Sequence, residues 1–188
     1  MAESSKANDA IYATAEFVGY SLWLVPHAAA ERELQGVIDE LATRLETPSF
    51  LPHMTLLGGI MGLQEEEVVR KTQLVADGLE TLDLQVSAVS SKELLYFQCV
   101  FALLKMTPAL ENAHEHAKQV YERLEEPSFM PHVSLVYGDL STEDRRALAQ
   151  EFGPRFDGTQ MKMERLQLWN TTGPVKQWKL VKEIALRR

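Results

Sequence analysis

The stretch Pro48-Ser49-Phe50-Leu51-Pro52-His53-Met54-Thr55-Leu56 occurs a second time as Pro127-Ser128-Phe129-Met130-Pro131-His132-Val133-Ser134-Leu135. The offset is constant, because 132 − 53 and 127 − 48 are both 79. Both prolines, the serine, the phenylalanine, the histidine and the final leucine recur, and the other positions exchange Leu for Met, Met for Val and Thr for Ser. The residues between the copies show no obvious repetition, which makes a tandem structural repeat a weak explanation. We therefore interpret the duplicated block as a pair of functional units.

Each copy predicts a loop followed by a strand. The second proline stiffens the loop, and the strand begins at or near the histidine. The side chains of a strand alternate between its two faces, so His53 and Thr55 point the same way, as do His132 and Ser134. A single His-x-Thr pattern would more often satisfy a buried polar network. A block that is duplicated with both its imidazole and its hydroxyl favours function instead.

An imidazole beside a hydroxyl, supplied twice, suits acid–base chemistry at a phosphate. The unperturbed imidazole pKa is about 6.5, so near neutral pH one ring can accept a proton while another donates one. A serine or threonine hydroxyl can donate a hydrogen bond to an anionic oxygen. Two such units facing each other across a cleft would suit hydrolysis of a small phosphoester, with each proton transfer contributing roughly 10²–10⁴ in rate.

The two motifs resemble the paired His-x-Thr/Ser motifs of the 2H phosphoesterase superfamily. Three further stretches resemble its plant and fungal cyclic phosphodiesterase branch: Tyr20-Ser21-Leu22-Trp23-Leu24-Val25-Pro26, Tyr96-Phe97-Gln98-Cys99-Val100-Phe101, and the block from Pro131 to Leu140. The resemblance implies an α+β fold of two pseudo-symmetric lobes, each an antiparallel sheet backed by helices, around a central cleft (a LigT-like fold). On this basis residues 17–188 form a single bilobal domain, preceded by a flexible N-terminal segment, residues 1–16.

The resemblance also implies a metal-independent cyclic phosphodiesterase that needs no cofactor. Its expected substrates are ADP-ribose 1″,2″-cyclic phosphate, a by-product of tRNA splicing that would yield ADP-ribose 1″-phosphate, and nucleoside 2′,3′-cyclic phosphates, which would yield nucleoside 2′-phosphates. In the scheme carried over, His132 is the general base and His53 the general acid, while Thr55 and Ser134 bind the non-bridging phosphate oxygens. The two histidine roles could be exchanged, because the local sequences are alike.

The resemblance further suggests that Trp23 and Tyr137 bind substrate. Trp23 lies in a strand predicted over residues 17–25, where a tryptophan buried in the core is an equally good interpretation. Tyr137 lies five residues beyond His132, on the opposite strand face by strict alternation. It could reach the cleft only if a bulge, or the end of the strand at Gly138, turned it.

Composition and charge limit the partners. The chain of 188 residues is 45% hydrophobic and 24% charged, which is ordinary for a soluble globular protein. Its net charge of −8 argues against a long nucleic acid partner but does not exclude a small cyclic nucleotide as the ligand. We expect the protein to be a monomer. We see no membrane-spanning run and no secretory signal, so a cytoplasmic location is the default and a nuclear one is possible.

Hydrophobic periodicity predicts the remaining elements. Helices are expected over residues 28–46, 64–79, 108–124 and 141–152, with Thr107 as an N-cap and Ser141 and Asp144 as a capping box. Strands are expected over residues 82–89, 97–104, 161–170 and 178–186, with the late strands returning beside the opening one. We expect Gly58 and Gly59 to form a tight turn, His114 and His116 to face solvent, and Trp169 and Trp178 to serve packing.

Two other functions stay open. A same-class alternative is a 2′,5′-oligonucleotide phosphodiesterase or an RNA-end-processing enzyme, which the acidic charge disfavours. A different class is a nucleotide-binding module that has lost turnover. The presence of both histidines and both hydroxyls argues against that module.

Overall fold

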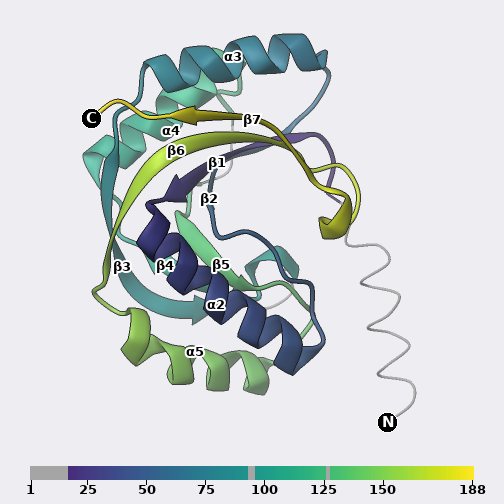
Figure 1. Cartoon of the computed structure of the whole chain (residues 1–188), viewed down its shortest axis with the longest axis vertical. Helices are drawn as coiled ribbons and strands as arrows, with labels where there is room; N and C mark the ends of the chain where they lie inside the picture. Colours follow the sequence, from purple (N-terminus) through teal and green to yellow (C-terminus); the bar gives the residue numbers. More distant parts are fainter. Residues whose placement is uncertain (1–16, 93–95, 126–127) are drawn as a thin grey trace.

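The computed structural model describes residues 17–92, 96–125 and 128–188, so the predicted N-terminal segment, residues 1–16, lies outside the described residues. The elements follow one another as β1 (Tyr20–Pro26), α2 (Ala28–Leu45), β2 (Met54–Ile60), α3 (Glu65–Asp77), β3 (Leu82–Ser91), η1 (Tyr96–Gln98), β4 (Val100–Leu104), α4 (Pro108–Tyr121), β5 (His132–Val136), α5 (Thr142–Phe156), β6 (Gln160–Asn170), η2 (Val175–Gln177) and β7 (Lys179–Ala185) (Figure 1). Within these ranges no helix is long and apolar enough to cross a membrane.

The strands of the described chain form one antiparallel sheet in the order β1-β2-β5-β4-β3-β6-β7, and a further pairing of β1 with β6 closes it into a ring. The ring has two halves, one with β1 and β2 and the other with β5, β4 and β3. The long strand β6 joins these halves, because its start pairs with β3 and the rest of it pairs with β1. On the other side the halves meet at a single residue pair, Met54 of β2 with Val133 of β5. Each of these residues directly follows a motif histidine. The predicted α+β fold of two lobes is confirmed, with the motifs at the junction between them.

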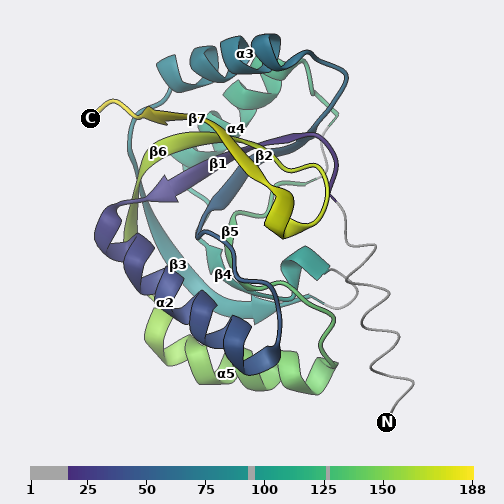
Figure 2. The same ribbon diagram turned by 45° about the vertical axis from the view of Figure 1, so that its right-hand side comes forward.

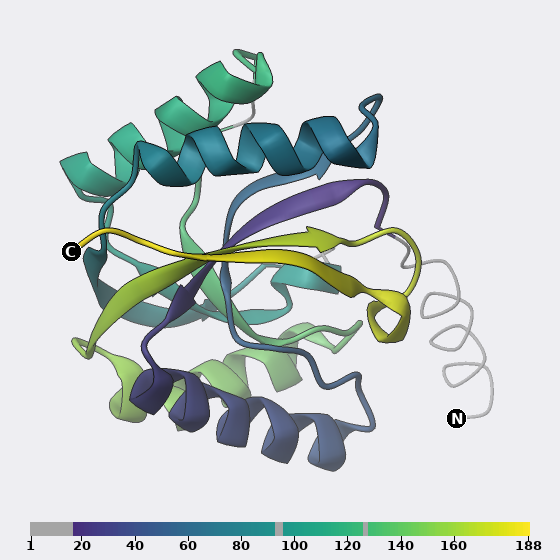
Figure 3. The ribbon, with the colours of Figure 1, turned by 45° about the horizontal axis from the view of Figure 1, so that its top comes forward.

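The helices cover the outside of the two halves (Figures 1 and 3). Helix α4 packs on β2 and α3 packs on β6 and β7, while α2 packs on β5 and α5 packs on β3 and β4. The helix that precedes each motif therefore packs on the strand that follows the other motif. Each half depends in this way on a helix from the other.

Local sequence explains which face of a helix is buried and where the helices begin. The buried residues of α2, among them Leu34, Val37 and Leu41, repeat at helical spacing and face the core. Helix α4 begins at Pro108, and the Thr107 hydroxyl accepts a hydrogen bond from the Leu110 N–H at 3.2 Å. Helix α5 is capped in the same way by Ser141, as predicted.

Several predicted elements differ from the structure: the opening strand begins at Tyr20 rather than at residue 17, and the helix predicted to end at residue 152 continues to Phe156. Gly58 and Gly59 lie inside β2 rather than in a tight turn, and Gly59 has a φ of +62° beside a shift in the β1–β2 register. A bulge absorbs the two glycines without ending the strand. The strand predicted from residue 97 begins only at Val100, because residues 96–98 form a 3₁₀ turn. Strand β6 lies beside the opening strand β1, as predicted (Figure 2).

We predict that Thr107→Ala lowers the free energy of unfolding by about 1 kcal/mol, because the Leu110 N–H loses its acceptor. Urea unfolding measures the change. Thr107→Ser keeps the acceptor and should lose less than half as much. Gln64→Ala is a matched control at the α3 N-cap, where no side chain makes a capping hydrogen bond, and it should change little. Equal losses in all three variants would contradict the capping role.

Candidate active site

Each motif histidine is held by a main-chain carbonyl two residues earlier. His53 Nδ1 lies 2.6 Å from the Leu51 oxygen, and His132 Nδ1 lies 2.8 Å from the Met130 oxygen. A carbonyl oxygen only accepts, so Nδ1 carries the hydrogen in each ring and a neutral ring has its lone pair on Nε2. The two copies therefore share the orientation and the tautomer of their imidazoles, and both present Nε2 for proton transfer.

His53 is packed against an aromatic stack. Its ring centroid lies 3.5 Å from that of Trp23, with 8° between the planes, and Trp169 stacks on Trp23 at 4.6 Å and 23°. Two rings this close to one indole cannot share a face, so Trp23 is sandwiched between His53 and Trp169. Trp23 is only 2% exposed although it lines the cleft. This geometry favours a packing role, because neither indole face is open to a nucleotide base.

Tyr137 reaches His53 from the other lobe. Strand β5 ends at Val136, so strict alternation no longer governs Tyr137. Its ring stacks on Phe50 at 3.7 Å, and its hydroxyl lies 3.5 Å from His53 Nε2. Burial raises the pKa of the Tyr137 phenol, which therefore stays protonated and able to donate a hydrogen bond.

The two motif hydroxyls line the same cleft. Ser134 Oγ donates a hydrogen bond to the Phe97 oxygen at 3.0 Å, and Thr55 lies opposite Trp23 in the β1–β2 register. A hydroxyl carries one hydrogen, so Ser134 must rotate about its Cβ–Oγ bond to donate to a ligand.

One cleft of about 480 Å³ is lined by the six residues that the sequence singles out: Trp23, His53, Thr55, His132, Ser134 and Tyr137. This volume lies within the range of small-molecule sites. Duplicated units 79 residues apart in the sequence are thus brought to one cavity at the junction of the lobes.

The prediction that His114 faces solvent is wrong. His114 is 7% exposed, lines the cleft, hydrogen-bonds to the Leu56 oxygen through Nδ1 at 2.8 Å and stacks on Phe129 at 4.0 Å. His116 is also half-buried, with its Nε2 3.3 Å from the Leu74 oxygen. The spacing rule separates the two faces of the helix. It does not show that both are solvated, and α4 is covered by β2 on one side and α3 on another.

Other cleft residues escaped the sequence analysis. Ser21 lies two residues before Trp23 on the same strand face, so alternation could have indicated it. Lys92, Gln98 and Thr171 come from segments whose place depends on the closed sheet, and no local pattern marks them. Trp178, predicted to serve packing alone, also lines the cleft.

Burial decides the charge of the histidines in the free protein. It lowers the pKa of His53 to about 3, with a smaller contribution from the nearby His132. It also lowers the pKa of His132, and the Lys92 cation adds to that effect. The hydrogen bonds to Leu51 and Met130 oppose these shifts without cancelling them. Both rings are therefore neutral at pH 7 before a ligand binds.

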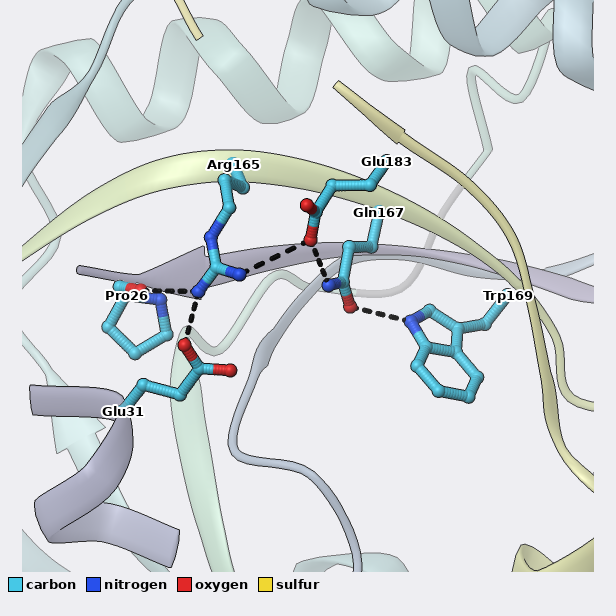
Figure 4. A network of polar contacts seen from close by, with 6 residues as sticks. All are labelled: Pro26, Glu31, Arg165, Gln167, Trp169 and Glu183. Carbon is cyan, nitrogen blue, oxygen red and sulfur yellow. Dashed lines mark hydrogen bonds and ion pairs between the residues drawn. The ribbon is translucent and has the colours of Figure 1, made fainter. Parts of the chain in front are cut away.

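A polar network ends at Trp169, the outer ring of the aromatic stack (Figure 4). Arg165 binds Glu31 through Nη2, and its Nη1 lies 3.3 Å from Glu183 Oε2. The same carboxylate oxygen accepts a hydrogen bond of 2.6 Å from Gln167 Nε2, whose own Oε1 accepts one of 2.7 Å from Trp169 Nε1. The Arg165 charge thus fixes the Gln167 amide, and that amide fixes the indole behind Trp23.

A metal ion would need a cluster of side chains that could bind it. Over residues 17–92, 96–125 and 128–188, no group of three or more His, Cys, Asp or Glu side chains could hold a metal ion.

Comparison with known proteins identifies the family of the chain. The profile of the family described as "Cyclic phosphodiesterase-like protein" matches residues 18–186. The cyclic phosphodiesterase of Arabidopsis thaliana is 32% identical over 156 residues, which cover 81% of this chain and 84% of the plant protein.

Solved structures show the same fold at low identity. The Escherichia coli LigT complex with 3′-AMP has a TM-score of 0.60 at 13% identity, covering 92% of this chain and all of that one. The TT0787 protein of Thermus thermophilus has a TM-score of 0.57 at 18% identity, covering 90% of this chain and 97% of that one.

The bilobal fold and its paired motifs define a 2H phosphoesterase. Within that class, the chain belongs to the cyclic phosphodiesterase-like family, and it is a phosphodiesterase that hydrolyses cyclic phosphates. The resemblance stated from the sequence is confirmed.

We predict that Trp169→Leu raises the pKa of His53, because Trp23 loses the ring behind it and water gains access to the imidazole. NMR titration of the histidine ring protons from pH 4 to pH 8 measures the change. The unmodified protein should show no His53 titration above pH 4, and the variant should begin to titrate there. Trp169→Phe keeps a ring in place and should shift less. An unchanged His53 in Trp169→Leu would mean that the stack does not exclude water.

Proposed function

We propose that this enzyme hydrolyses ADP-ribose 1″,2″-cyclic phosphate and nucleoside 2′,3′-cyclic phosphates without a metal, by acid–base catalysis between His53 and His132. The observation that carries the proposal is the matched pair of imidazoles in one cleft, each with Nδ1 on a carbonyl and Nε2 left for proton transfer. Small-molecule ligands of LigT, such as 3′-AMP, are in keeping with a nucleotide-sized site.

The proposed reaction begins with His132 as general base. Its neutral Nε2 takes a proton from water as the water oxygen attacks phosphorus. The ester bond to one ribose oxygen breaks, and His53 donates a proton from Nε2 to that oxygen. Water, the cyclic diester and the two rings thus yield a phosphomonoester and a free ribose hydroxyl, with one proton moved from His53 to His132. Exchange of that proton through solvent restores the starting state.

Because His53 is buried and neutral in the free protein, it must take up a proton from solvent when the substrate binds, before it can act as the acid. The ring is neutral in the free protein, because its pKa is about 3. An anionic phosphate beside Nε2 favours the imidazolium and raises this pKa. Thr55 and Ser134 would donate hydrogen bonds to the non-bridging oxygens. The Tyr137 hydroxyl, now 3.5 Å from Nε2, would turn from the ring to the phosphate as His53 takes up its proton.

We expect the partner to be a small cyclic nucleotide, bound by a monomer. The net charge of −8 disfavours a long RNA. A location in the cytoplasm, or in the nucleus, would give access to the by-products of RNA processing.

We predict that His53→Ala and His132→Ala each lower turnover of these cyclic phosphates at least about 100-fold while circular dichroism stays unchanged. The assay contains ADP-ribose 1″,2″-cyclic phosphate and the four nucleoside 2′,3′-cyclic phosphates, with EDTA present throughout. His116→Ala is the matched control, because its ring lies outside the cleft, and it should keep full activity. Loss of turnover in EDTA would contradict metal independence. Nucleotide binding without turnover would favour the binding module, and turnover of 2′,5′-linked oligonucleotides alone would favour the other enzyme.

The same variants separate acid from base. A p-nitrophenyl phosphodiester has a leaving group that departs without protonation, so the acid variant should recover most of its activity on it. The proposed assignment predicts recovery for His53→Ala and none for His132→Ala. The opposite result would exchange the two roles.

A further inference from the structure

The cleft carries one formal charge among the lining residues that the structure describes. Lys92 is the only Lys, Arg, Asp or Glu in that lining, and the other residues are apolar or carry a hydroxyl, an amide or an imidazole. The chain as a whole has a net charge of −8. A single cation in a cleft without a described carboxylate, within an acidic protein, is a feature that the proposed acid–base chemistry does not use.

Lys92 is more exposed than the reacting groups in the same cleft. Lys92 is exposed, directly after the end of β3, whereas His53 and Ser134 are buried and Thr55 and His132 are half-buried. Its positive charge lowers the pKa of His132, so the ammonium lies close enough to that ring to act on it. A nucleotide whose cyclic phosphate lies against the two histidines occupies a cleft that Lys92 also lines.

The main chain of Lys92 is fixed by a buried cation. Arg145, 3% exposed, donates to the Lys92 oxygen through Nη1 and to the Leu140 oxygen through Nε at 2.8 Å. The Lys92 N–H donates to the Gln98 oxygen at 3.1 Å. The segment after β3 is thus tied to the segment after β5, and the exposed ammonium extends from an anchored Cα.

We propose that Lys92 binds a second anionic group of the substrate, a phosphate or diphosphate carried on the nucleoside away from the cyclic phosphate. This inference rests on the proposed function and selects between its two substrate classes. It favours ADP-ribose 1″,2″-cyclic phosphate, whose diphosphate supplies such a group, over nucleoside 2′,3′-cyclic phosphates, which have none. An ammonium suits this task, because it acts on phosphate as a point charge and needs no fixed fork geometry.

The test compares two substrates that share one reacting ring. Adenosine 2′,3′-cyclic phosphate has only the cyclic phosphate, and adenosine 5′-diphosphate 2′,3′-cyclic phosphate adds the second anionic group. The unmodified enzyme should prefer the diphosphate by kcat/KM. Lys92→Ala should lower that preference roughly 3-fold to 10-fold at low salt, through KM and not kcat, because the contact is remote from the reacting atoms.

Three controls accompany the test. Lys92→Arg keeps the cation and should keep most of the preference. Lys179→Ala removes an exposed lysine on β7 that does not line the cleft, and it should change nothing. Raising the salt to roughly 0.5 M should reduce the preference of the unmodified enzyme and leave Lys92→Ala unaffected.

The outcomes separate this inference from the function on which it rests. No turnover of either substrate by the unmodified enzyme would overturn the proposed function. Turnover with an unchanged preference in Lys92→Ala would overturn the inference alone. An equal loss on both substrates would also overturn it, because Lys92 would then act on the reacting phosphate.

Discussion

The site depends on one hydrogen bond, made twice, between a histidine Nδ1 and the carbonyl two residues earlier. The proline between them makes this bond possible. It has no N–H, it fixes its own φ, and it holds the preceding residue extended, so that residue's carbonyl is left for the ring. Pro52 serves His53 in this way and Pro131 serves His132. The order Pro-His in each motif is therefore a device for setting a tautomer.

The closed sheet turns two local devices into one site. Met54 and Val133 make the single pair between β2 and β5, and each follows its histidine directly, so both histidines lie where the lobes join and line one cleft. Sequestering them there lowers stability in acid. The imidazole of His53 has a pKa of about 6.5 in the unfolded chain and about 3 in the folded protein. As the pH falls from 6.5 towards 3, the unfolded chain therefore binds a proton that the folded protein does not bind, and the free energy of unfolding decreases. The fold is stabilised by burying an aromatic stack around a group that must later be charged.

Much of the fold and of the site could be predicted from the sequence because the information was local. Helix caps such as Thr107, the alternation that pairs His53 with Thr55, and the return of β6 beside β1 depend on near neighbours or on a well-marked resemblance. His114 could not be placed, since its burial depends on which strand α4 covers. Gly59 was misread because a positive φ can serve a bulge as well as a turn. Lys92 has no local signature, and only the assembled cleft makes it the one cation in the described lining.

Catalysis by the two buried histidines is tested most sharply by the pH dependence of kcat/KM for a cyclic phosphate substrate. This quantity reports the free enzyme, in which one histidine must be protonated and the other neutral. Both pKa values lie below 6.5, so we expect a maximum below that pH and a fall of up to about tenfold per pH unit through the neutral range. The corresponding limb of kcat should lie at higher pH, because bound phosphate raises the pKa of the acid. A kcat/KM that is flat, or that rises, between pH 6 and pH 8 would contradict catalysis by this pair of buried histidines.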